Sequence, residues 1–114
     1  MKNPRPLFPD PLLAEEYALG DAPRVAAFLR RHLFLLPLLL AAARPLEEHF
    51  PGASVVLDVR TDPDGDGQPT LVAAIAPHTE PEEAVAAFLR FFDAWWMDTE
   101  PEAHNKLVFV LEYQ

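Results

Sequence analysis

The chain has 114 residues, 50% of them hydrophobic, and a formal net charge of −9 from 18 acidic and 9 basic residues. It is long enough for one domain with a hydrophobic core and too short for two domains of ordinary size. The acidic charge argues against nucleic-acid binding, which needs clustered Lys and Arg for the phosphates, and it is compatible with a basic protein partner. The absence of cysteine excludes disulfides, thiolate nucleophiles and cysteine-ligated metals.

The N-terminal half predicts an arm and two helices. Prolines at 4, 6, 9 and 11 predict an irregular arm over residues 1–21, ahead of a single domain over 22–114. Asp21 is the expected N-cap of a helix over about 22–31. A second helix is expected over about 33–50, with a kink or break at Pro45 and an end before Pro51. The prolines also interrupt any export signal, and the apolar run at 33–43 is shorter than the ~20 residues that span a bilayer, so we expect a cytoplasmic protein without a membrane partner.

The C-terminal half predicts strands around one long helix. Residues 55–60 and 70–76 alternate as two strands of an antiparallel hairpin, and 107–113 is a third strand. The order α-α-β-β-α-β predicts an α+β fold with a three-stranded sheet and helices packed on one face. A crossover from the second strand would place the third strand beside the first, leaving the first in the middle.

Residues 79–98 predict the helix on which the domain is organised. Thr79 and Glu82 have the spacing of a capping box, and Pro81 lies in the first turn. Helical periodicity predicts a core stripe of Val85, Phe88, Leu89, Phe92 and Trp96. Phe91 and Trp95 lie on the edge of that stripe, where an aromatic side chain packs in the core or reaches a partner.

The second face of the sheet is the expected interaction surface. It would carry Val56, Val72, Val108 and Val110 among charged residues. So much valine on an uncovered face is unfavourable in water. We therefore expect the N-terminal arm or a second subunit to cover it, and we favour a homodimer.

The turn after the first strand is the nearest match to a metal site. Asp62, Asp64 and Asp66, followed by Gly67, match the opening of a calcium loop. The twelfth position is Ala73 in place of the bidentate Glu, and Asp-Gly pairs also suit a plain hairpin turn. A cation site and a turn without a ligand both remain open.

Other chemistry has little support. The histidines, at 32, 49, 78 and 104, have no i, i+4 spacing, and the only serine, Ser54, lies outside any nucleophile motif. Asp58, mid-strand and next to Arg60, is the carboxylate to inspect for acid–base work, although an ordinary cross-strand ion pair explains it better. We predict no cofactor and no catalytic residue.

Several short segments support a resemblance: Phe50-Pro51, the Asp62-Pro63 turn, Pro81 to Ala84, Phe92-Asp93-Ala94-Trp95-Trp96, and Lys106-Leu107 through Leu111-Glu112. On these the chain resembles a group of small bacterial proteins of unknown function, over about residues 34–113. The resemblance implies one structural unit and brings no activity or cofactor. We therefore expect a non-enzymatic protein that acts through protein contacts, of toxin-neutralising or adaptor type. A small-ligand or divalent-cation binder that uses the Asp62, Asp64 and Asp66 turn is the second possibility, and a carboxylate-based enzyme is the third.

Overall fold

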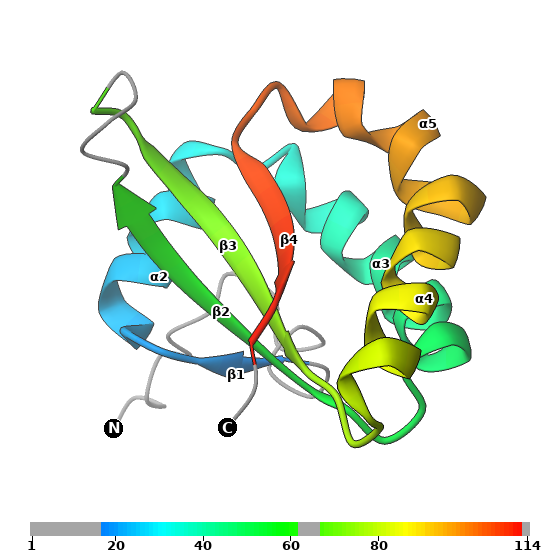
Figure 1. Ribbon diagram of the computed structural model, residues 1–114. Coiled ribbons are helices and arrows are strands. Elements are labelled where there is room, and N and C mark those ends of the chain that lie inside the picture. The colour runs from blue at the N-terminus through cyan, green and yellow to red at the C-terminus, as the bar shows by residue number, and fades with distance from the viewer. Residues whose placement is uncertain (1–16, 62–66, 113–114) are drawn as a thin grey trace, which may run out of the picture.

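The fold consists of two strand–helix–strand units joined by an antiparallel pair of strands (Figure 1). The computed structural model describes residues 17–61 and 67–112. In chain order the elements are β1 (Ala18–Leu19), α2 (Ala22–Arg31), α3 (Leu35–His49), β2 (Ser54–Thr61), β3 (Pro69–Ala76), α4 (Pro81–Phe91), a π-helical segment (Phe92–Trp96), α5 (Met97–Thr99), a 3-10 turn (Glu100–Ala103) and β4 (Leu107–Leu111). The α+β class is confirmed, with a mixed sheet of four strands in place of three.

The strand order is β1-β2-β3-β4, which corrects the predicted order. The predicted hairpin is confirmed, because β2 and β3 pair antiparallel. The outer pairs, β1 with β2 and β3 with β4, are both parallel. β4 therefore lies beside β3, and the position beside β2 that we predicted for it is taken by β1.

The strand β1 was not predicted, because it falls at the end of the expected irregular arm. Two residues are too few to show an alternating pattern. The segment is nevertheless held on the domain at both ends. The buried hydroxyl of Tyr17 donates a 2.6 Å hydrogen bond to the carbonyl of Leu39, and the N–H of Gly20 donates to the carbonyl of Leu57 at 2.9 Å.

The first two helices begin and end close to the predicted residues. The carboxylate of Asp21 accepts from the N–H of Arg24 at 3.3 Å, which confirms the N-cap of α2. The helix α3 begins two residues later than expected and continues through Pro45 without a break. At its end the Nδ1 of His49 lies 2.8 Å from the carbonyl oxygen of Pro45, a local cap.

The helix α4 begins one residue later than the capping box predicts. Glu80, in an extended conformation, is the N-cap, and its side chain makes no capping hydrogen bond. Pro81 explains this start, because the residue before a proline is pushed out of the helical region while the proline itself suits the first helical position. The predicted pairing of Thr79 with Glu82 is therefore wrong.

The buried face of α4 also differs from the predicted stripe. Ala84, Ala87 and Phe91 are buried, whereas Val85 is 48% and Leu89 is 59% exposed. Helical spacing alone does not choose between two neighbouring apolar faces. The smaller face, with two alanines, lies against the core.

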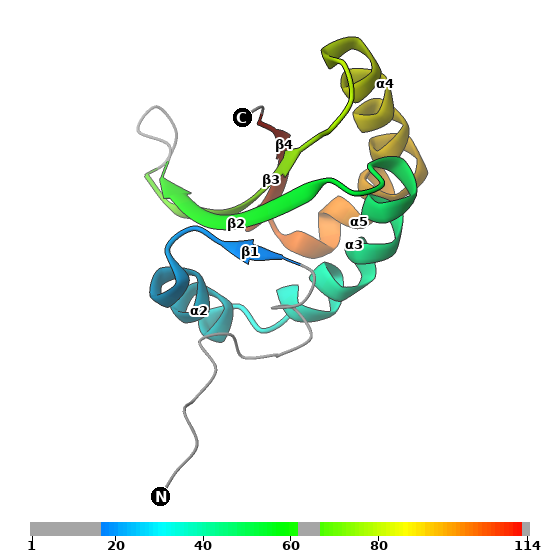
Figure 2. The same cartoon turned by 90° about the horizontal axis from the view of Figure 1, so that it is seen from below.

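The core fills the space between the helices and one face of the sheet. That face carries Val55, Leu57, Val59, Leu71, Ala73, Ile75, Leu107 and Phe109. Figure 2 shows the curvature of the sheet, with α2 and α3 both on its lower side in that view. Residues of α2, α3 and α4 share one buried cluster with this face of the sheet.

Candidate functional site

The open face of the sheet carries the predicted valines. Val56, Val108 and Val110 are half-buried there, and Val72 is 6% exposed. The pairing register puts Val56 beside Ala74 and Ala74 beside Val110, while Val72 lies beside Val108. These side chains therefore form adjacent rows across three strands, on the face opposite the core.

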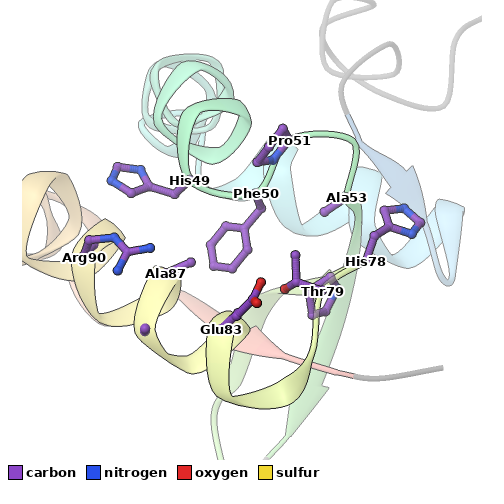
Figure 3. A pocket seen from close by; sticks show the side chains of 11 residues that line it. His49, Phe50, Pro51, Ala53, His78, Thr79, Glu83, Ala87 and Arg90 are labelled. Carbon is purple, nitrogen blue, oxygen red and sulfur yellow. The ribbon is translucent and has the colours of Figure 1, made fainter.

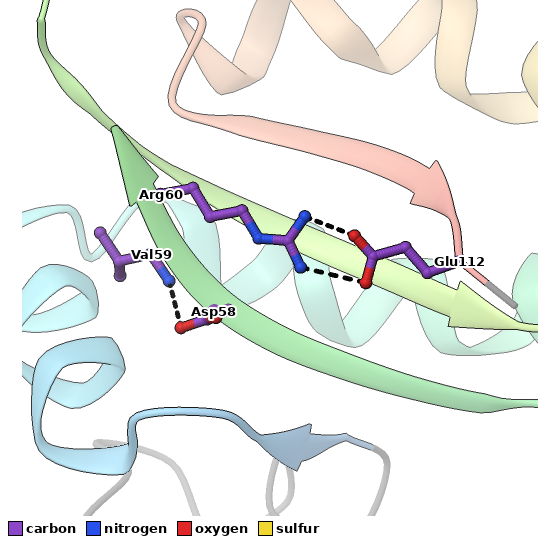
Figure 4. Close-up of polar contacts among 4 residues, drawn as sticks. All are labelled: Asp58, Val59, Arg60 and Glu112. Atoms are coloured by element: carbon purple, nitrogen blue, oxygen red, sulfur yellow. Dashed lines mark hydrogen bonds and ion pairs between the residues drawn. The ribbon is translucent and has the colours of Figure 1, made fainter. Parts of the chain in front are cut away.

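An ion pair crosses the open face from β2 to the end of β4 (Figure 4). The two guanidinium nitrogens of Arg60 donate to the two carboxylate oxygens of Glu112, at 2.5 and 3.1 Å. The hydrogen bond from Arg60 lowers the pKa of Glu112, and the same bond raises the pKa of Arg60. Both side chains are close to half exposed, so this pair orders the surface more than it stabilises the fold.

Asp58 forms no ion pair with any residue in the described ranges, so the expected cross-strand ion pair is not found there. Its carboxylate accepts a 3.0 Å hydrogen bond from the N–H of Val59. It also packs against Gly20 so closely that a Cβ at position 20 would lie 2.9 Å from the Asp58 Cγ. Asp58 therefore packs against the turn after β1.

The predicted metal turn, Asp62, Asp64 and Asp66, lies outside the described residues. Within residues 17–61 and 67–112 no three His, Asp or Glu side chains are grouped closely enough to hold a metal ion. The Nδ1 of His32 lies 3.0 Å from the carbonyl oxygen of Phe28 at the end of α2, which is a local contact. The cation site stays a prediction.

The aromatic residues at the end of α4 divide differently from the prediction. Phe91 is fully buried, with its ring 5.2 Å from that of Phe109, so it packs in the core and not at the edge. Trp95 is half-buried, 6.2 Å from Phe109, and keeps part of its ring at the surface. Of the two, Trp95 alone remains a candidate for contact with a partner.

A pocket of about 330 Å³ opens between the end of α3 and the start of α4. In Figure 3, His49 and Arg90 lie on one side of Phe50, and His78 and Thr79 lie on the other. Glu83 projects from the first turn of α4 below them. The pocket therefore combines a guanidinium, two imidazoles, a hydroxyl and one carboxylate around an aromatic floor.

The chemistry of this pocket suits a small ligand with a carboxylate or phosphate group. Arg90 offers fork-shaped donors for such an anion. The Nδ1 contact of His49 with Pro45 leaves its Nε2 as the ring atom available to a ligand. Glu83 opposes a purely anionic ligand and favours one that also carries a donor.

Sequence reasoning missed this pocket because its residues come from three separate segments of the chain. His49 ends α3, His78 follows β3, and Arg90 lies in the last turn of α4. The only local signals were Pro51-Gly52 and Pro77, which mark the chain reversals around it.

The exposed face of α4 was also missed as a surface, because the periodicity assigned it to the core. It combines the exposed Val85 and Leu89 with the half-buried Phe88 and Phe92. We call these four residues the α4 stripe. Their i, i+3, i+4 and i+7 spacing places them along one side of the helix.

Comparison with known proteins adds no relative. No family model matches the chain, and no curated protein or solved structure matches it either. The resemblance over residues 34–113 stays a prediction. None of the helices in the described ranges is by itself long and apolar enough to span a bilayer; α2 and α3 satisfy the length and composition only as a pair, bent by 117°.

Proposed function

We propose that the protein is a non-enzymatic cytoplasmic protein that acts by binding proteins, and that the α4 stripe is its principal contact surface. The observation that carries the proposal is the exposure of Val85 and Leu89 beside two half-buried phenylalanines. Contiguous apolar surface of this kind on one helix is typical of a groove-binding or helix-packing interface. Trp95, also half-buried, is a further aromatic side chain that a partner could contact.

Charge supports one class of partner. The chain carries a net charge of −9, so a basic protein would be attracted to it over long range. A toxin-neutralising or adaptor role is one instance of such binding. The valine rows on the open sheet face, Val56, Val108 and Val110, provide a second surface, for which a second copy of the chain is our proposed partner.

Site-specific photo-crosslinking in cells tests the α4 stripe. A photoreactive side chain at position 85 should capture another protein, because that position is exposed and apolar. The same probe at Arg44, whose side chain is 88% exposed on α3, is the matched control. Leu89→Lys should abolish the crosslink from position 85 without changing the melting temperature. Equal capture from positions 85 and 44, or no effect of Leu89→Lys, would contradict the proposal.

A small-ligand function is the second candidate, and the pocket at His49, His78 and Arg90 favours it. Thermal-shift measurements with small amino-carboxylate and phosphate compounds test it, because a ligand that binds only the folded state raises the melting temperature. Arg90→Ala should remove the shift. A compound that stabilises the wild type and Arg90→Ala equally does not bind in this pocket.

A further inference from the structure

The helix α2 is a basic element in an acidic chain. Three of the nine basic residues, Arg24, Arg30 and Arg31, lie on this helix, whose sequence contains no acidic residue. None of the three makes an ion pair with a residue in the described ranges. The helix dipole explains Arg30 and Arg31, because a cation in the last turn is favourable, but it opposes Arg24 in the first turn. Helix stability therefore does not account for Arg24.

A cavity of about 220 Å³, here called the α2 cavity, lies between α2 and the sheet, where α2 packs on β2 (Figure 1). Arg24, Phe28 and Arg31 line its helical side, and their spacing of four and three residues puts them along one side of α2. Val59 and Pro69 line its sheet side. Phe28 and Val59 are buried, whereas the two arginines are exposed. The cavity therefore has an apolar floor and a cationic rim.

His32 also lines the α2 cavity, with a ring that is held in place. It stacks on Phe28 with the ring centroids 4.4 Å apart, and its Nδ1 lies 3.0 Å from the carbonyl oxygen of Phe28. Because a carbonyl oxygen can only accept, Nδ1 carries the proton of that contact and Nε2 is the ring atom available to a ligand. The cavity thus presents flat ring surfaces beside the positive charges of Arg24 and Arg31.

We propose that the α2 cavity binds a small organic anion that carries one acidic group on a flat aromatic body, such as an aryl carboxylate. Arg24 and Arg31 lie about 10 Å apart along the helix axis. One guanidinium binds the acidic group as a fork, and the other stacks on the ring. Phe28 and Val59 contact the body of the ligand. This site goes beyond the proposed function, because it shares no residue with the α4 stripe or with the pocket between α3 and α4.

The size and charge of the molecule narrow the ligand class. Pockets for drug-sized molecules have about 300–1,000 Å³, so a cavity of about 220 Å³ suits one ring or two fused rings. The net charge of −9 repels multiply charged anions over long range, which favours a single acidic group over a nucleotide. The apolar floor offers inorganic phosphate nothing to contact, and a neutral ring leaves the arginines unused. A ring with one negative charge uses both parts of the cavity.

Calorimetric titration with 2-naphthoate tests the proposal, with 2-naphthamide as its uncharged analogue. The naphthoate should bind, and the amide should bind about tenfold more weakly, because it loses the charge-assisted hydrogen bonds from a guanidinium to a carboxylate. Inorganic phosphate should not displace the naphthoate. No binding of 2-naphthoate, equal binding of the amide, or displacement by phosphate overturns the proposal.

Substitutions on α2 locate the site. Arg24→Gln and Arg31→Gln should each weaken the binding of 2-naphthoate about tenfold, since each removes a fork or a stacking cation. Arg30→Gln is the matched control, because Arg30 is exposed on the same helix and does not line the cavity. It should change the affinity less than about twofold, because a distant exposed charge is screened by salt. Equal losses for Arg30→Gln and Arg31→Gln overturn the proposal.

Filling the cavity is a test that leaves the charges in place. Ala27 lines the cavity and is exposed on α2, so a leucine there occupies the space of the ligand and still suits a helix. Ala27→Leu should abolish the binding of 2-naphthoate. Binding that is unchanged in Ala27→Leu places the ligand elsewhere and overturns the proposal. Circular dichroism of each variant shows that it is folded before its affinity is compared.

A last variant separates this site from the proposed function. Arg90→Ala alters the pocket between α3 and α4 and should leave the binding of 2-naphthoate unchanged. Loss of binding in Arg90→Ala places the ligand in that pocket and overturns the assignment to the α2 cavity. Crosslinking from position 85 tests a different helix, α4, so its result is separate from the affinity for 2-naphthoate.

Discussion

Phe91 and Trp96 are both buried on the core side of one continuous helical segment, although they are five positions apart. In a regular α-helix that spacing would turn Trp96 well away from Phe91. Residues 92–96 are π-helical, and their i→i+5 hydrogen bonds bring positions five apart onto one side. The ring of Phe109 then contacts both, at 5.2 Å from Phe91 and 4.8 Å from Trp96.

The buried face of α4 predicts a clear difference between neighbouring apolar residues. Phe91→Ala should lower the free energy of unfolding by about 3–5 kcal/mol, because it leaves a cavity in the core. Leu89→Ala should change it by less than about 0.5 kcal/mol, because that side chain is largely exposed and alanine suits a helix. Urea denaturation of both variants measures the difference. A larger loss of stability for Leu89→Ala than for Phe91→Ala would indicate that the face predicted from periodicity is the buried one.

The π-helical segment predicts an unequal tolerance to deletion. Removing the exposed Ala94 would allow 92–96 to become regular α-helix, with Phe91 and the second tryptophan then at i, i+4 and still on one side. Removing the exposed Ala86 would instead rotate Ala84 away from Phe91. The Ala94 deletion should therefore retain a cooperative thermal transition with the higher melting temperature of the two. A lower melting temperature for the Ala94 deletion would show that the π geometry itself is required.

Local rules identified most of the helices and strands, but they did not identify β1 or predict how the elements assemble. Asp21 and Pro23 identify the start of α2, and the alternation around Leu57 identifies β2, because caps and period-two patterns act within a few residues. The position of β4 in the sheet could not be predicted, because the place beside β2 is taken by β1, whose two residues carry no recognisable pattern. The face of α4 depended on a choice between two apolar sides, which only the packed core decides.

The candidate sites also divide into those that a local sequence pattern predicts and those that only the packing of distant segments creates. The open valine face was predictable, because alternation assigns each strand residue to a side. The pocket was not, since His49, His78 and Arg90 come together only through the packing of α3 against α4. The partner of Arg60 was missed as well, because Glu112 is 52 residues away in the chain.

Close packing of Gly20 against Asp58 predicts a coupled pair of substitutions. Gly20→Ala should lower the free energy of unfolding by on the order of 1 kcal/mol, because Asp58 must turn away and lose its hydrogen bond to the N–H of Val59. In an Asp58→Ala background the same substitution should cost little. A double-mutant cycle by chemical denaturation measures the coupling. Additive effects would mean that the contact carries no energy.

The Arg60–Glu112 pair predicts a small stability term that depends on pH. The pKa of Glu112 is lower in the folded chain than its ordinary value of 4.5, so the term is present above pH 4.5 and is lost as the pH falls through the folded pKa. The pKa of Arg60 is raised, so arginine stays charged throughout this range. A double-mutant cycle with Arg60→Gln and Glu112→Gln should give about 0.2–1 kcal/mol at neutral pH and none in strong acid. Coupling that persists in acid would rule out the charge as its source.

The antiparallel β2–β3 pair is the only strand contact between the two strand–helix–strand halves in the described part of the chain. A polypeptide divided between these strands would yield one fragment with α2 and α3 and another with α4. Each would present an apolar strand edge and a half-covered sheet face to water. We therefore expect fragment complementation. Each half should fold only when the other half is present, so the two halves could serve as a split reporter.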